Sequence, residues 1–177
     1  MSYYGNFSAH KVVEVNQSTG LRTGHMVAQT KFLKGSLQGD SLDNGYILAL
    51  DVAKNELKLS DGTEETLFMH FTEEHMPIFN HRGLKYFSVP FMKGADGEDA
   101  YCYPRAIAIY TNDTWTTDNF SGDLPKAGEY AQATVTDGVL TIGEVAAGKP
   151  VFLVRRVTLP DAQAPAGEFI YVGKAKA

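Results

Sequence analysis

The feature that most constrains this chain is the shortness of its apolar segments. Stripes with the 3.6-residue period of a helix are nearly absent, whereas short runs rich in Val, Ile, Tyr, Phe and Thr recur between Gly, Asp, Asn and Pro. Such runs are typical of β-strands, and a spacing of roughly 8 to 15 residues is typical of a β-sandwich or β-barrel. We therefore predict an all-β fold with little helix. The runs are HKVVEVN, HMVAQTKF, GYILALD, NELKLSD, KYFSVPF, RAIAIYT, AQATVTD, GVLTIGE, VFLVRRV and EFIYVG.

Turn-forming pairs separate several of these runs. Asp137-Gly138 lies between two alternating arms and predicts a hairpin with a type I′ turn, because that turn requires positive φ at both central residues. Asn44-Gly45 and Asp61-Gly62 predict further turns.

Residues 63–76, TEETLFMHFTEEHM, fit two interpretations. A Thr followed by two acids can open a helix, but Leu67, Met69 and Phe71 alternate as in a strand, and Pro77 follows soon after. We predict a strand near 66–71, followed by a turn or a single helical turn.

Residues 1–31 differ in residue composition from residues 32–177. They carry three aromatic side chains in a setting of Gly, Asn and Ser, followed by a turn-rich connector. We predict an extended N-terminal arm over 1–31 and a single β-rich domain over 32–177. Because the arm has too little apolar surface to fold alone, we expect it to be mobile, or to lie on a neighbouring subunit or on its own domain. The aromatic residues are Tyr3, Tyr4 and Phe7.

Composition excludes several classes of protein. A net charge of -5 and a pI near 5.5 argue against direct binding of nucleic acid, which requires a basic face. The single cysteine, Cys102, excludes an intramolecular disulfide and a cysteine-based metal site. The N-terminus lacks the pattern of a signal peptide, and no run approaches the roughly 20 apolar residues that span a membrane. We therefore expect no membrane partner and folding in the cytoplasm.

Residues 143–150, GEVAAGKP, nearly match the phosphate-binding loop G-x-x-x-x-G-K followed by Ser or Thr. Pro150, however, stands where the magnesium-binding hydroxyl belongs. Such a loop also needs a following helix whose N–H groups hold the anion, whereas the apolar run VFLVRRV follows here. We expect a connection between two strands, with Pro150 at a strand start, where its missing N–H is tolerated.

Three histidines, His70, His75 and His81, are the strongest candidates for metal ligands. The inverted zinc motif is H-x-x-E-H, but His70 and His75 enclose FTEE, one residue too many. At this spacing, neither a helix nor a strand places both rings on one face. We predict that these are ordinary surface or core histidines, with a metal assembled from distant residues as the alternative.

No catalytic or cofactor-binding motif is assembled in the sequence. G-x-S-x-G is absent, and Cys102 has no histidine near it in the chain. Residues 93–100, KGADGEDA, gather Asp96, Glu98 and Asp99, which is typical of a solvated loop, with a weak cation site as the alternative. We therefore expect no catalytic residues, no cofactor, no metal and no enzymatic activity.

Residues 111–123, TNDTWTTDNFSGD, place Trp115 and Phe120 among hydroxyl and amide side chains. One interpretation is an aromatic platform on which a sugar stacks. The other is a surface loop with a half-buried anchor, or a protein contact, since Trp and Tyr favour interfaces. Together with the aromatic residues of the arm, Trp115 and Phe120 are the candidate contacts with a partner.

Four segments together resemble the small, β-rich cement or decoration proteins of tailed-phage heads. The similarity covers roughly residues 32–75 and 122–173. It lies in the general residue composition of the segments and in their order along the chain. It implies no catalytic residues and implies binding to the major capsid protein or other virion proteins, often as a homo-oligomer. The segments are LKGSLQGDSLDNGYILALD, GEYAQATVTDGVLTIGE, GKPVFLVRRVTLPDAQ and FIYVGKA.

Three hypotheses follow. The first is a virion structural protein that folds in the host cytoplasm and stabilises a phage capsid shell through protein–protein contacts. The second is a carbohydrate-binding β-sandwich module of an adhesin-type protein that uses Trp115. The third is an enzyme with a metal held by His70, His75 or His81.

Overall fold

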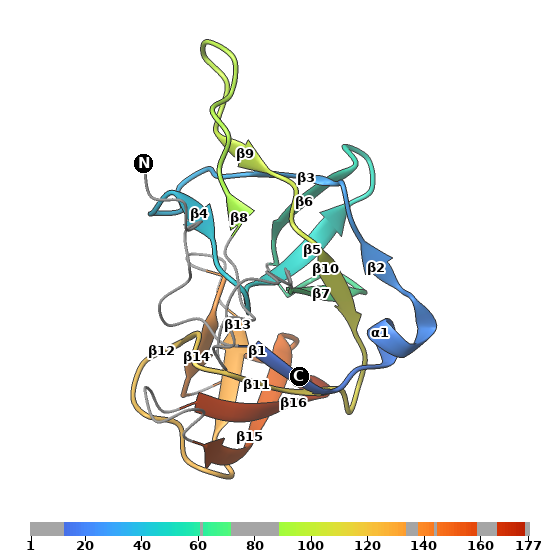
Figure 1. Cartoon of the computed structure of the whole chain (residues 1–177). Coiled ribbons are helices and arrows are strands. Elements are labelled where there is room, and N and C mark those ends of the chain that lie inside the picture. The colour runs from blue at the N-terminus through green and yellow to red at the C-terminus, as the bar shows by residue number, and fades with distance from the viewer. Residues whose placement is uncertain are drawn as a thin grey trace, which may run out of the picture.

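Strands dominate the computed structural model, which describes residues 13–60, 62–71, 89–133, 138–143, 145–158 and 166–175 (Figure 1). In this part of the chain the only helix is α1 (Thr19–Thr23). The structure therefore confirms an all-β fold with little helix. No helix in the described ranges has the length and apolarity needed to cross a membrane.

The first large sheet, called sheet 1, has seven strands. All its pairs are antiparallel except β12–β14, which is parallel. In spatial order its strands are β1 (Val13–Gln17), β11 (Thr114–Thr117), β16 (Ala166–Lys174), β15 (Pro150–Thr158), β13 (Tyr130–Ala133), β14 (Leu140–Ile142) and β12 (Phe120–Ser121).

The second large sheet, called sheet 2, also has seven strands, and a two-stranded sheet of β4 (Ser41–Leu42) and β8 (Val89–Pro90) accompanies it. The pair β3–β6 is parallel, and the other pairs are antiparallel. In spatial order the strands of sheet 2 are β2 (Met26–Val27), β10 (Ala106–Ile109), β7 (Leu67–His70), β5 (Ile47–Asp51), β6 (Glu56–Leu59), β3 (Lys31–Leu33) and β9 (Tyr101–Cys102).

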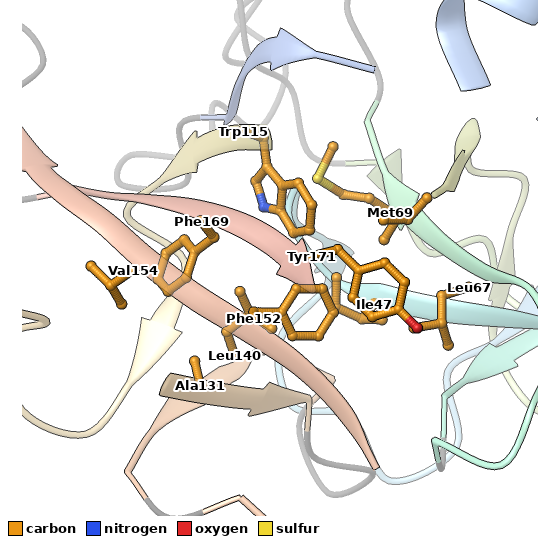
Figure 2. Packing of buried hydrophobic residues seen from close by; sticks show 11 residues of the cluster. Ile47, Leu67, Met69, Trp115, Ala131, Leu140, Phe152, Val154, Phe169 and Tyr171 are labelled. Carbon is orange, nitrogen blue, oxygen red and sulfur yellow. The ribbon is translucent and has the colours of Figure 1, made fainter. Parts of the chain in front are cut away.

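Sheet 2 is buried on both faces, so the protein has two apolar clusters. Along β7, Leu67 and Met69 enter the cluster shared with sheet 1, whereas Phe68 enters the cluster on the opposite face. Figure 2 shows the shared cluster, in which side chains of both sheets meet. Burial on both faces explains why β5 (ILALD), β7 (LFMH) and β10 (AIAI) carry apolar residues at successive positions, whereas β6 (ELKL) alternates.

Two local predictions are confirmed in these sheets. The predicted strand near 66–71 is β7 (Leu67–His70). The predicted hairpin pairs β13 with β14, with Ala131 opposite Ile142, although Asp137 of its turn lies outside the described residues. Gly45 has φ 92°, as the predicted Asn44-Gly45 turn requires, whereas Asp61 of the other predicted turn lies outside the described residues.

The described part of the predicted arm joins the two sheets. β1 pairs with β11 at the edge of sheet 1, and β2 pairs with β10 at the edge of sheet 2. Residues 13–31 thus lie against the protein's own domain, one of the alternatives left open by the sequence. Tyr3, Tyr4 and Phe7 lie outside the described residues.

The near-match to a phosphate loop is a connection between strands, as predicted. It leaves β14 with Gly143 at φ 138°, turns at Gly148 at φ 75°, and enters β15 at Pro150. A strand follows the turn, so no helix N-terminus is present to hold a phosphate. The connection passes β13, which lies between β14 and β15 in sheet 1.

Candidate interaction site

Residues 91–100, called the projecting hairpin, extend beyond the body of the protein between β8 and β9 (Figure 1). Near its base Met92 and Tyr101 exchange two main-chain hydrogen bonds, at 2.7 and 3.0 Å. At the tip the Glu98 N–H donates to the Ala95 carbonyl at 2.8 Å, and Gly97 has φ 87°, which favours glycine. The segment is therefore an ordered, narrow hairpin.

Gly94 allows the two arms of the hairpin to lie close together. A Cβ atom at this position would lie 2.5 Å from the carbonyl oxygen of Asp99 and 2.7 Å from that of Glu98. Both distances are shorter than a van der Waals contact, and both neighbours are main chain, so any larger residue would separate the arms.

The base of the hairpin is held from two sides. On one side β8 pairs with β4, and the Phe91 N–H donates to the Asp40 carbonyl at 2.9 Å. On the other side β9 pairs with β3, and the Lys34 N–H donates to the Ala100 carbonyl at 2.8 Å. Anchored arms restrict the motion of the tip, so little conformational entropy is lost when it binds a partner.

Cation–π contacts strengthen this base. The Lys31 ammonium lies 4.8 Å from the centre of the Tyr101 ring, and the Lys34 ammonium lies 5.6 Å from the centre of the Phe91 ring. Such contacts contribute on the order of 0.5–1 kcal/mol at exposed sites.

The surface of the hairpin combines negative charge with apolar area. Three acidic residues are exposed at the tip, Asp96, Glu98 and Asp99, and Lys93 is the only basic residue of the hairpin. Met92 is 43% exposed at the base. An ordered projection with an acidic tip and an apolar base is suited to a protein partner that offers a basic and apolar surface.

The hairpin was missed as a site because its acids were interpreted as a solvated loop. A signal was present: GADG stands between the apolar runs SVPFM and AYCY, a pattern typical of a hairpin. That the hairpin projects, however, depends on β8 and β9 joining two different sheets, which local sequence does not encode.

Trp115 is not part of an exposed surface. It lies in β11, is 1% exposed, and packs edge-to-face on Phe152 with 5.5 Å between ring centres (Figure 2). The interpretation of this stretch as a surface loop is therefore wrong for 114–117, because β11 is an interior strand of sheet 1 and all four of its residues are buried. In this conformation the ring offers no platform for a sugar or a partner.

Phe120, the other aromatic residue predicted to contact a partner, is half-buried in β12. Its ring lies 6.4 Å from that of Phe169, between ring centres, at the edge of the shared cluster. The remaining predicted contacts, Tyr3, Tyr4 and Phe7, lie outside the described residues.

His70 is a core histidine. It is fully buried, and its Nδ1–H donates to the Asp43 carbonyl at 2.7 Å. Desolvation lowers the pKa of His70 to about 4, although the hydrogen bond to Asp43 acts in the opposite direction. His75 and His81 lie outside the described residues, and within the described ranges no three His, Cys, Asp or Glu side chains group as metal ligands.

Cys102 is also part of the core. It is fully buried in β9 within the second apolar cluster. Burial raises the pKa of its thiol to about 12, so the reactive thiolate is scarcely populated near neutral pH.

A cavity of about 10 Å³ lies beside Trp115, among residues of β1, β10 and β11. It is lined by Met69, Ile109 and Asp113, among others. A volume of this size holds one water molecule at most, and organic ligands need about 300 Å³ or more.

The chain matches no family model, and no curated protein and no solved structure matches it significantly.

Proposed function

We propose that this chain is a non-enzymatic virion structural protein of the cement or decoration type. It folds in the host cytoplasm, binds the major capsid protein or other virion proteins, and stabilises the shell by protein–protein contacts. The observation that carries the proposal is the projecting hairpin, which is anchored at its base in two sheets and exposes an acidic tip.

An anchored hairpin suits a protein that holds together a shell. Because its arms are already ordered, contacts at the tip and base contribute to affinity without a large entropic cost. Its carboxylates also select a basic surface on the partner and fix its orientation. The resemblance of the surrounding segments to phage cement proteins agrees with this role.

Capsids that lack the protein provide the test. Wild-type protein is mixed with such capsids, and both bound protein and the shell's resistance to heat or denaturant are measured. We expect saturable binding and a more stable shell. Wild-type protein that leaves the capsids bare would overturn the proposed function.

A pair of variants tests the hairpin itself. Asp96→Asn with Glu98→Gln removes two negative charges from the tip, and Glu65→Gln with Asp123→Asn removes two from exposed positions elsewhere. We expect the tip variant to bind capsids at least tenfold more weakly and the control to bind like wild type. Equal binding by both variants would exclude the hairpin as the contact.

A further inference from the structure

The outer face of sheet 1 carries an apolar row that crosses three strands. Tyr130 lies opposite Leu153, and Leu153 lies opposite Ile170. The next residues along these strands, such as Ala131 and Phe169, belong to the cluster between the sheets, so alternation places the row on the opposite face. Tyr130 is 49% exposed, and Leu153 and Ile170 are half-buried.

Two arginines lie beside this row on β15. The pairing of β15 with β16 is irregular between Val154 and Arg156, and such an irregularity lets two consecutive side chains reach the surface. The Arg155 and Arg156 side chains are 53% and 66% exposed.

Both guanidinium groups share one carboxylate, that of the buried Glu168. Arg156 Nε donates to its Oε2, and Arg155 Nη1 lies 3.5 Å from its Oε1. Glu168 also accepts from Asn16 Nδ2 at 3.3 Å. Two positive charges against one negative charge leave a net positive charge at the surface, next to the apolar row.

The projecting hairpin has the complementary arrangement. Its exposed Met92 lies near the base, and its carboxylates lie at the tip, four to seven residues further along the chain. Methionine adapts its shape to irregular apolar surfaces, and arginine pairs strongly with carboxylates. One chain therefore supplies both halves of an apolar-plus-ionic contact.

The two surfaces cannot meet within one molecule. Figure 1 shows the hairpin at one end of the protein and β15 and β16 at the other. We propose that the projecting hairpin of one copy docks on the outer face of sheet 1 of a second copy, with its carboxylates at Arg155 and Arg156 and Met92 on the apolar row. This inference rests on the proposed function, because it makes a second copy of the chain the virion protein that receives the hairpin.

Because the two surfaces differ, the contact is head-to-tail. Such contacts produce a closed ring when the rotation between copies closes and an open chain when it does not. In a ring, and in the interior of a chain, each copy is linked to two neighbours.

Charge reversal tests the contact in the free protein, by sedimentation velocity at low and high salt. Wild type is expected to self-associate at low salt and to dissociate as salt screens the ion pairs. Asp96→Lys with Glu98→Lys makes the tip positive. Arg155→Glu reverses the charge at the outer face of sheet 1, while Arg156 remains paired with Glu168. Each variant alone is expected to associate at least tenfold more weakly than wild type.

The decisive measurement is the mixture of the two variants. The positive tip of one variant fits the negative face of the other, and the remaining tip and face are unaltered and form the wild-type contact, so the mixture is expected to associate again. Glu65→Lys with Asp123→Lys, and separately Lys54→Glu, are controls that change charge at other exposed positions and should leave association unchanged. A wild type that stays monomeric at low salt, or a mixture that stays as weak as its components, would overturn the inference.

Capsid binding separates this inference from the proposed function. If the function is right and the inference wrong, the Arg155→Glu protein binds capsids like wild type and the free wild type stays monomeric. If the inference is right and the function wrong, wild type self-associates but leaves capsids bare.

Discussion

Asn119 donates its side-chain amide to the main-chain carbonyl of Asn44 at 2.7 Å, and both residues are buried. Asn119 stands between β11 and β12 of sheet 1, whereas Asn44 lies in the turn that precedes β5 of sheet 2. A Cβ atom on the adjacent Gly45 would lie 3.1 Å from Asn119 Cβ. The two sheets are therefore held close together here, through one amide and one glycine.

Asn119→Ala is expected to destabilise the protein by about 1–3 kcal/mol, because the buried Asn44 carbonyl loses this donor without gaining water. The free energy of unfolding from urea titration measures the effect. Asp123→Asn, an exposed change in the same segment, is the control and should stay within about 0.5 kcal/mol of wild type. A loss no larger than that of the control would show that the contact contributes little.

His70 is expected to make stability depend on pH. The pKa of His70 is about 4 when folded and 6.5 for an ordinary histidine, so below pH 6.5 the unfolded chain binds a proton that the folded chain does not. Stability therefore falls as the pH falls from about 6.5 to about 4, by about 3 kcal/mol in total. Urea titrations across this range measure the slope.

The contribution of His70 is isolated by comparing variants. His70→Gln keeps a donor for the Asp43 carbonyl but does not titrate, so its stability should vary less with pH between 4 and 6.5. Ser36→Ala, a change in an exposed turn that leaves His70 in place, should keep the wild-type slope. Identical slopes in all three proteins would contradict a buried neutral histidine.

Cys102 is expected to resist thiol reagents in the folded protein. Burial and a pKa of about 12 leave little accessible thiolate, so Ellman's reagent should react only through opening of the fold. The rate should rise steeply with urea as unfolding begins. Ser36→Cys, which places a thiol in an exposed turn, should add one thiol that reacts at once, and fast reaction of wild type would contradict the burial.

Trp115, the only tryptophan, is expected to report burial by fluorescence. Its emission should be blue-shifted in the folded protein, and iodide should quench it far less than in the urea-unfolded chain. Equal quenching in both states would mean that the ring is accessible, and would return Trp115 to the candidates for sugar binding.

The fold class was predictable because β-strands leave a local signature. Apolar and polar residues alternate along both arms of the β13–β14 hairpin. The strand of residues 66–71 was indicated by apolar residues at every second position, Leu67, Met69 and Phe71. Pro150 marks a strand start for the same local reason, its missing N–H. Each of these features depends on neighbours within a few residues.

The surroundings of Trp115 were not predictable in this way. The three threonines beside Trp115 suggest a solvated loop, but in β11 they lie between β1 and β16, where the ladder satisfies the main chain. Burial of this segment depends on β1, which precedes it by roughly a hundred residues, and on β16, which follows it by about fifty residues. This non-local effect overrides local propensity. The hairpin was missed for the same reason, since its anchoring strands β3 and β4 are distant in sequence.

Gly94→Ala is expected to separate binding from stability. The added Cβ would meet the carbonyl oxygens of Asp99 and Glu98, so the arms of the projecting hairpin must move apart and its tip is displaced. Only Phe91, at the base of the hairpin, packs against an apolar cluster, and residues 92–100 contribute to neither cluster, so the thermal midpoint should change by only a few degrees. Capsid binding and self-association should both weaken at least tenfold, because both depend on the position of the carboxylates.

Gly97→Asn is the matched control for this change. Asparagine tolerates positive φ better than other residues with a side chain, and a Cβ at Gly97 has no neighbour within 4 Å. The tip should therefore keep its shape and its binding. If Gly94→Ala binds as well as Gly97→Asn, the shape of the hairpin is irrelevant to recognition; if Gly94→Ala unfolds the protein, the hairpin is part of the stable core and the separation proposed between binding and stability is wrong.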